Sequence, residues 1–182
     1  AHNMDLPMAV TESNVVSAWD VLAGCEVSGA CAVLGGGLVG TETAEFLAQK
    51  GLKVSIVEML DQIATGESET VMPLIKKDFE EHDVKEYVNT ALQEVKENAF
   101  TVKLPDGTIQ DLTFDYGFNC LGMRSNNPVL PELQEAFADT HTHIYTIGDS
   151  VRARRIMEGT MEGRAILNVL ESQGYLHLEP LE

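Results

Sequence analysis

Three glycines and one acidic residue stand at a spacing that could bind a dinucleotide. The glycines follow the pattern Gly35-x-Gly37-x-x-Gly40, and Glu58 comes eighteen residues after the last of them. Gly35 permits a tight turn, Gly37 lets the backbone approach a pyrophosphate, and Gly40 lets a helix pack closely on a strand. The carboxylate of Glu58 could accept hydrogen bonds from ribose hydroxyl groups. The pattern therefore predicts a nucleotide site, provided that the right elements surround it.

The segments around these residues predict those elements. An apolar run at 30–34 predicts a buried strand before the glycines. After them, small and apolar residues recur at helical spacing over 44–48, and Gly51 is a natural end for that helix. A second apolar run at 54–57 ends on Glu58. The order strand, glycine loop, helix, strand, acid favours a dinucleotide site over an ordinary α/β turn.

The start of the predicted helix adds hydrogen-bond donors to the loop. The first N–H groups of a helix have no partner within it, and the helix dipole places partial positive charge there. Gly36, Leu38 and Val39 lie in or beside this first turn. We therefore expect residues 35–40 to bind a pyrophosphate through backbone atoms.

The chain changes its pattern twice after Glu58. Apolar residues from Val71 to Phe79 recur at helical spacing, whereas from Val84 the period becomes two. The strands predicted from there are 85–88, 92–96, 99–104, 108–114 and 116–120. We expect an α/β fold, a Rossmann-like three-layer nucleotide-binding domain with a parallel sheet and an inserted antiparallel β-meander.

The two ends of the chain predict further elements. Residues 14–23 read as a short helix with Trp19 on its apolar side. Residues 132–137 predict another short helix, 144–147 a strand, and 155–173 a long amphipathic helix.

Composition narrows the classes of function. The 182 residues include 29 acidic and 12 basic ones, and the net charge of −17 disfavours nucleic acid and anionic membranes as partners. No apolar run approaches the roughly 20 residues of a membrane span, and no signal peptide is visible, so we expect a cytoplasmic protein. Cys25, Cys31 and Cys120 share no metal-ligand spacing, and no nucleophile–base pair is evident. We therefore expect neither a metal site nor a catalytic side chain.

Several runs of sequence resemble the NAD(P)H-binding domain of flavoprotein reductases that bind two dinucleotides. These runs are residues 33–45, 114–122 and 144–149. Within that class the chain is similar to the C-terminal half of multidomain NADH:flavin oxidoreductases of the 2,4-dienoyl-CoA reductase, enoate reductase and trimethylamine dehydrogenase group. Residues 19–24 and 148–156 carry this finer likeness. The resemblance covers nearly all of the chain.

The resemblance implies that the glycine loop, Glu58 and Glu42 bind NADH. Gly35, Gly37 and Gly40 would hold the pyrophosphate, and Glu58 the adenosine ribose. Glu42 would face the nicotinamide carboxamide. The alternative for Glu42 is a surface acid in the first helical turn, stabilised by the helix dipole.

The resemblance also assigns residues nearer the C-terminus. Gly122 matches the last glycine of a family motif. Asp149, after Gly148, matches an acid that accepts a hydrogen bond from the ribityl chain of FAD. The helix that follows would point its N-terminus, near Ile156 and Met157, at the flavin, where its dipole favours the negative charge of the reduced ring.

The same resemblance implies a division of the chain. Residues 1–27 would be a leader from the FAD domain or its connection, 28–122 the NAD(P)H-binding domain, and 123–182 the C-terminal segment of the FAD-binding domain. The FAD domain's own glycine loop would lie upstream, with an FMN-binding barrel and an iron–sulfur cluster. We therefore expect a piece of a larger reductase that lacks FAD and is inactive alone. Its partners would be the missing parts of the parent chain, and a homodimer is one arrangement that would cover the edge of strand 144–147.

Two functions stay open at this point. One is an electron-input module that positions NADH for hydride transfer to FAD, and the other is a non-catalytic module that binds ADP or another nucleotide, or is structural. NADH is expected over NADPH because Glu58 would oppose the 2′-phosphate and residues 59–64 contain no Arg or Lys. A penalty of about 1.5–3 kcal/mol corresponds to about ten- to a hundredfold discrimination.

Overall fold

The computed structural model describes residues 2–6 and 14–175. The chain divides into a larger unit, Asn3–Gly122, and a smaller unit, Ala1–His2 with Met123–Glu182. The remaining stretches of the predicted leader and C-terminal segment, residues 1, 7–13 and 176–182, lie outside the described residues. Assignment of the two units to an NAD(P)H domain and an FAD domain stays a prediction.

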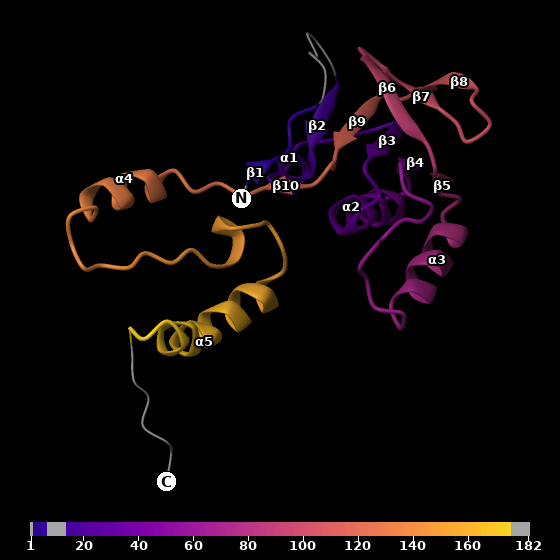
Figure 1. Ribbon diagram of the computed structural model, residues 1–182. Helices are drawn as coiled ribbons and strands as arrows, with labels where there is room; N and C mark the ends of the chain where they lie inside the picture. Colours follow the sequence, from indigo (N-terminus) through magenta and orange to yellow (C-terminus); the bar gives the residue numbers. More distant parts are fainter. Residues whose placement is uncertain (1, 7–13, 176–182) are drawn as a thin grey trace. The chain divides into compact units, whose positions relative to one another are not determined.

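A parallel sheet of five strands forms the centre of the larger unit (Figure 1). Its strands, in sheet order, are β2 (Val15–Ser17), β9 (Tyr116–Asn119), β3 (Ala30–Leu34), β4 (Lys53–Val57) and β5 (Lys85–Tyr87). In the register of the sheet, Leu34 lies opposite both Val57 and Asn119. The carboxyl ends of β3, β4 and β9 therefore meet at one edge, which we call the carboxyl edge. Ligands of open parallel sheets bind beyond this edge.

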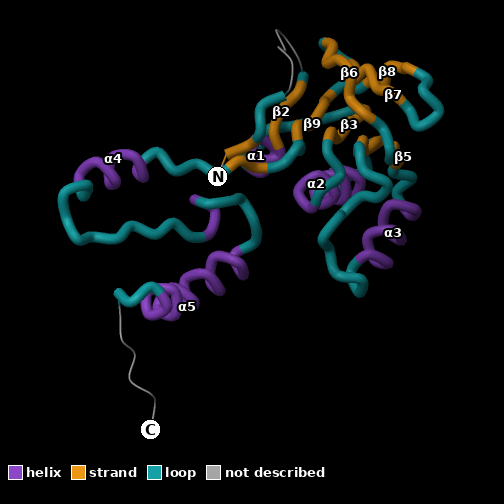
Figure 2. The backbone as a smooth tube through the Cα atoms, in the orientation of Figure 1, coloured by secondary structure: helices purple, strands orange, loops and turns teal. Residues whose placement is uncertain are grey.

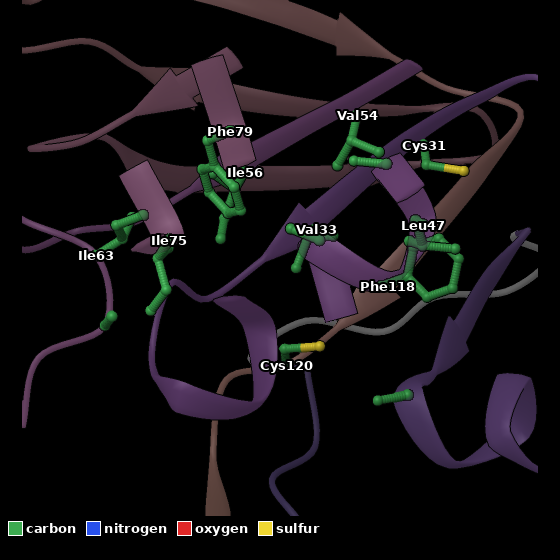
Figure 3. Close-up of a cluster of buried hydrophobic side chains, with 14 of the residues drawn as sticks. Cys31, Val33, Leu47, Val54, Ile56, Ile63, Ile75, Phe79, Phe118 and Cys120 are labelled. Carbon is green, nitrogen blue, oxygen red and sulfur yellow. The ribbon is translucent and has the colours of Figure 1, made fainter. Parts of the chain in front are cut away.

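Three helices supply the layer on one face of this sheet. They are α1 (Ala18–Leu22), α2 (Leu38–Gln49) and α3 (Met72–Glu81). Alternate residues of β3 point to opposite faces, as the pleat requires. Cys31 and Val33 lie in the buried cluster on the helix side, whereas Ala32 and Leu34 lie in the cluster on the other side. Figure 3 shows the helix-side cluster, with Leu47 of α2 beside the strand residues.

An antiparallel sheet supplies the layer on the other face. Its order is β6 (Ala91–Lys96), β7 (Ala99–Lys103), β8 (Ile109–Thr113). Phe100 and Val102 of β7 are fully buried, and the ring centroids of Phe100 and Phe114 lie 4.6 Å apart. The layers are thus helices, parallel sheet and antiparallel sheet, which confirms the predicted α/β fold with its inserted meander.

The smaller unit contains helices and extended chain (Figure 2). Its elements are β10 (Met123–Arg124), which pairs with β1 (His2–Asn3), then α4 (Val129–Ala136), the short 3₁₀ helix η1 (Gly148–Ser150) and α5 (Ile156–Ser172). None of the residues in α4, η1 or α5 is buried. Over the stretches 2–6 and 14–175, no helix combines the length and the apolar character needed to cross a membrane.

The predicted strand at 144–147 is wrong. Residues 142–147 are in neither helix nor strand, and among the residues described no strand pairs with them. An apolar run forms a strand only where a neighbouring strand accepts and donates its backbone hydrogen bonds. The exposed strand edge that a homodimer was expected to cover is therefore not present in this structure.

The predicted helix at 14–23 is only partly right. Val15–Ser17 form β2, because they pair with β9 in a parallel ladder. The helix begins at Ala18, where Ser17 and Asp20 cap each other's backbone N–H groups. Ala18 and Val21 face the core, and Trp19 is 55% exposed instead of lying on the apolar side.

Candidate functional site

The glycine loop connects β3 to α2 at the carboxyl edge. Gly35 has a φ of 100°, and its N–H donates to the carbonyl of Val57 at 2.8 Å. A Cβ on Gly35 would lie 2.4 Å from the carbonyl oxygen of Cys120. A Cβ on Gly40 would lie 1.8 Å from the carbonyl oxygen of Gly35. Any side chain at either position would therefore displace backbone, as the spacing predicts for a tight turn against a closely packed helix.

The peptide of Gly36 is held on both sides. Its N–H donates to Oε2 of Glu58 at 2.6 Å. Its carbonyl accepts the Thr41 hydroxyl at 3.2 Å and the N–H of Ala64 at 2.6 Å. Ala64 is buried with a φ of 52°, an uncommon conformation for a residue with a side chain. These bonds fix the loop before any ligand binds.

Donors at the start of α2 remain open. The N–H groups of Gly37, Leu38 and Val39 have no acceptor within the part of the chain that the structure describes. A Cβ on Gly37 would meet no atom within 4 Å, so its backbone faces open space. Three backbone donors at a helix N-terminus suit the oxygens of a pyrophosphate. The loop residues thus fit the phosphates of a dinucleotide.

Glu58 follows β4 and lies beside the loop. Besides Gly36, its carboxylate accepts the N–H of Leu60, through Oε1 at 2.8 Å. A carboxylate has about four acceptor positions, so capacity remains for ribose hydroxyl groups. The two backbone donors also fix the negative charge at this position, where it would repel a 2′-phosphate.

Two further residues predicted for NADH lie on this unit. Glu42 is exposed and lies in the second turn of α2, not in the first turn as expected, because the helix begins at Leu38. Gly122 follows β9 at the carboxyl edge with a φ of 109°. Its carbonyl accepts the N–H of Met4 at 3.0 Å.

The residues predicted to contact a flavin lie in the smaller unit. Gly148 has a φ of 61°, and Oδ1 of Asp149 accepts the N–H of Arg154 at 3.1 Å. Ile156 and Met157, at the N-terminus of α5, are 91% and 59% exposed. A depression of about 390 Å³ is lined by Gly148, Asp149, Arg154, Arg155, Ile156, Gly159 and Thr160.

One carboxylate that lines this depression suits a ligand with N–H or O–H groups. Oδ2 of Asp149 has no hydrogen-bond partner in residues 2–6 and 14–175. In the first turn of α5, Oε2 of Glu158 is buried and likewise has none there, but Glu158 does not line the depression. A carboxylate oxygen in the wall of a depression can accept a hydrogen bond from a hydroxyl group, so Asp149 fits a polar cofactor.

Sequence reasoning missed Thr41, Ala64 and Leu60, which anchor the loop or its acid. Thr41 follows the last glycine directly, and a hydroxyl in the first turn of a nucleotide-binding helix is a signal that could have been used. Ala64 and Leu60 act through backbone N–H groups, for which their side chains give no signal.

A larger cavity of about 660 Å³ lies at the opposite edge of the sheet. It is bounded by the amino ends of three strands, at Ala30, Lys53 and Lys85, and by residues of β8. None of the residues predicted for a cofactor lines it. No cluster of three His, Cys, Asp or Glu side chains that could hold a metal occurs among the residues placed by the structure.

Comparison with known proteins identifies a matching family model. The model for pyridine nucleotide-disulphide oxidoreductases matches residues 17–163. A bilirubin reductase of Mediterraneibacter gnavus (strain CC55_001C) is 37% identical over 173 residues, which cover 93% of this chain and 26% of that protein. An NADH oxidase of Thermoanaerobacter brockii is 31% identical over 159 residues, which cover 82% of this chain and 23% of that protein. The chain thus spans about a quarter of the length of these relatives.

Solved structures share the fold. Histamine dehydrogenase from Rhizobium sp. 4-9 superposes with a TM-score of 0.74 at 16% identity, over 100% of this chain and 28% of that one. A 2-naphthoyl-CoA reductase superposes with a TM-score of 0.71 at 19% identity, over 87% of this chain and 24% of that one.

Proposed function

The chain belongs to the pyridine nucleotide-disulphide oxidoreductase family, whose members are oxidoreductases, and on that premise we propose that it is the NADH-binding, electron-input part of a flavin-dependent reductase. The observation that carries the proposal is the glycine loop. Its peptide at Gly36 is anchored on both sides, while the N–H groups of Gly37, Leu38 and Val39 stay open beside Glu58. Such a loop is preorganised for a dinucleotide pyrophosphate.

The residues of the chain position and stabilise the cofactors. When both are bound, NADH supplies a hydride and FAD accepts it. The open amides and the α2 dipole bind the pyrophosphate, Glu58 accepts the ribose hydroxyls, and Glu42 lies on the same helix to meet the nicotinamide carboxamide. Asp149 binds the polyol chain of the flavin, and the positive end of α5 stabilises charge on the reduced ring.

The finer assignment follows from the resemblance and from the covered lengths. We propose that residues 28–122 bind NADH, and that residues 1–27 and 123–182 belong to the FAD-binding domain of an enoate- or dienoyl-CoA-reductase-like parent. The rest of the parent would supply the FAD glycine loop, an FMN barrel and an iron–sulfur cluster. Relatives named as a bilirubin reductase and an NADH oxidase, each about four times longer, support a larger parent.

Calorimetric titration of the chain with NADH, NADPH and ADP tests the proposal. We expect saturable NADH binding, weaker NADPH binding, and a gain of NADH over ADP from the nicotinamide half. Gly37→Val should abolish binding without unfolding the chain, because its φ is ordinary and its side chain would point into open space. The control Lys85→Ala, at the cavity of the opposite edge, should bind as wild type does.

Two results would contradict the proposal. NADH binding that survives Gly37→Val but fails in Lys85→Ala would place the site at the other edge. Equal affinity for ADP and NADH would favour the non-catalytic nucleotide module. The proposed division also predicts that the purified chain is colourless and shows no NADH-driven reductase activity, so copurified FAD would refute it.

A further inference from the structure

One carboxylate ties both ends of the segment 148–154 to helix α5. Oε2 of Glu162 accepts the backbone N–H of Gly148 at 2.6 Å, and Oε1 accepts the guanidinium of Arg154. The backbone N–H of Arg154 in turn donates to Oδ1 of Asp149. We call Gly148, Asp149, Arg154 and Glu162 the Glu162 clamp.

Hydrogen bonds and an ion pair hold η1 against α5, because no buried apolar side chains do so. No residue of η1 or α5 is buried, whereas the larger unit has extensive buried clusters. Gly148 lies against Gly159: a Cβ on Gly148 would lie 3.5 Å from the Gly159 Cα, an ordinary contact without interlocking side chains. The Gly148 N–H and the Arg154 guanidinium also hold the pKa of the Glu162 carboxyl below its usual value, so the clamp is charged at neutral pH.

Glu162 bonds to two residues that line the depression of about 390 Å³, Gly148 and Arg154, but does not line it itself. Gly148, Asp149, Arg154 and the first turn of α5 line the depression, whereas Glu162 does not. Its carboxylate therefore acts on a ligand only through the groups that it holds.

We propose that Glu162 is a positioning residue that sets Asp149 and the N-terminus of α5 relative to each other, and thereby tunes how this depression binds a flavin and stabilises its reduced form. The flavin part rests on the proposed function. The clamp itself does not, because it consists of bonds within the chain.

The first test measures the hydrogen bond of the Gly148 amide in the chain without a cofactor. In ¹H–¹⁵N spectra of the chain, Glu162→Ala should shift the Gly148 amide resonance and speed its exchange with solvent. Glu162→Gln keeps an acceptor for that N–H and should largely restore both. Glu135→Gln, which removes an exposed acid from α4, is the matched control and should leave Gly148 unchanged. An unchanged Gly148 amide in Glu162→Ala overturns the clamp.

The second test uses the whole FAD-loaded reductase. Loss of a charge-assisted hydrogen bond is expected to weaken FAD binding by about tenfold or more in Glu162→Ala. The midpoint potential of the flavin should become more negative, because the positive end of α5 no longer faces the reduced ring in its native position. If Glu162→Ala fails to fold, Glu162→Gln replaces it, since that change removes the ion pair with Arg154, leaves an acceptor for the Gly148 N–H and alters no residue that lines the depression; the same shifts are expected at smaller size.

The outcomes separate the two proposals. An affinity and a potential equal to those of Glu135→Gln overturn the positioning role, even if the Gly148 amide responds. Failure of the wild-type reductase to bind FAD overturns the proposed function together with the flavin part of this inference, and the spectra of the chain still decide whether the clamp exists.

Discussion

Replacing Glu58 with Gln tests whether one carboxylate both fixes the glycine loop and selects the cofactor. Glu58 accepts the N–H of Gly36 at 2.6 Å and that of Leu60 at 2.8 Å. Glutamine keeps one acceptor and turns its NH₂ toward the second donor, so one charge-assisted bond is lost and the other becomes neutral. Bonds to charged groups contribute about 1.5–3 kcal/mol and neutral ones about 0.5–1.5 kcal/mol, so the free energy of unfolding should fall by about 2.5–4.5 kcal/mol.

The assay is urea unfolding, with an unchanged m value as the sign that only stability has changed. The control is Glu86→Gln, which removes the same charge from an exposed position on β5. Equal stability of the two variants would refute the anchoring role of Glu58. The ratio of NADPH to NADH dissociation constants should also fall by about tenfold in Glu58→Gln, and an unchanged ratio would refute the electrostatic account of selectivity.

Three further predictions concern stability and thiol reactivity. Gly35→Ala should lower the free energy of unfolding by at least about 2 kcal/mol, because an alanine is strained at this φ and its Cβ would meet the Cys120 carbonyl; urea unfolding like that of wild type would contradict this. Burial raises the pKa of the Cys31 and Cys120 thiols to about 11, so a thiol reagent at pH 8 should label exposed Cys25 fast and the other two only after denaturation. Three fast equivalents would be incompatible with these buried sites. Burial, with neighbouring acids, raises the pKa of Glu45, so the folded state holds that proton more tightly than the unfolded state, and the stability from it is present in acid and lost as the pH rises through the folded pKa. Glu45→Gln should therefore be more stable than wild type at pH 7, with a gain that shrinks in acid; a gain independent of pH would count against this cause.

The glycine loop was predictable because its requirements are local. The turn at Gly35 and the close approach at Gly40 need glycine whatever the rest of the fold does, and both are present. The position of Glu58 followed from the length of one helix and one strand. Its bond to Leu60 did not, because the backbone N–H two residues after the acid has no signature in the sequence.

The wrong predictions concern segments whose structure depends on a distant part of the chain, which the local sequence pattern does not specify. The apolar run at 144–147 has the composition of a strand, but among the described residues no neighbouring strand pairs with it. The predicted helix at 14–23 includes Val15–Ser17, but two β-branched valines favour a strand, and the segment pairs with β9. Nothing in the sequence singles out Glu162 and Arg154, which lie eight residues apart. Their bond, and that of Glu162 to Gly148, depends on how η1 packs against α5 in the folded chain.

The central claim, that NADH binds across the anchored glycine loop, is tested most directly by mapping its binding on ¹H–¹⁵N spectra of the chain. Saturating NADH should shift the open amides of Gly37, Leu38 and Val39 and the anchored amide of Gly36. Shifts confined to the cavity at the opposite edge, around Lys53 and Lys85, would contradict it, as would no shifts at all.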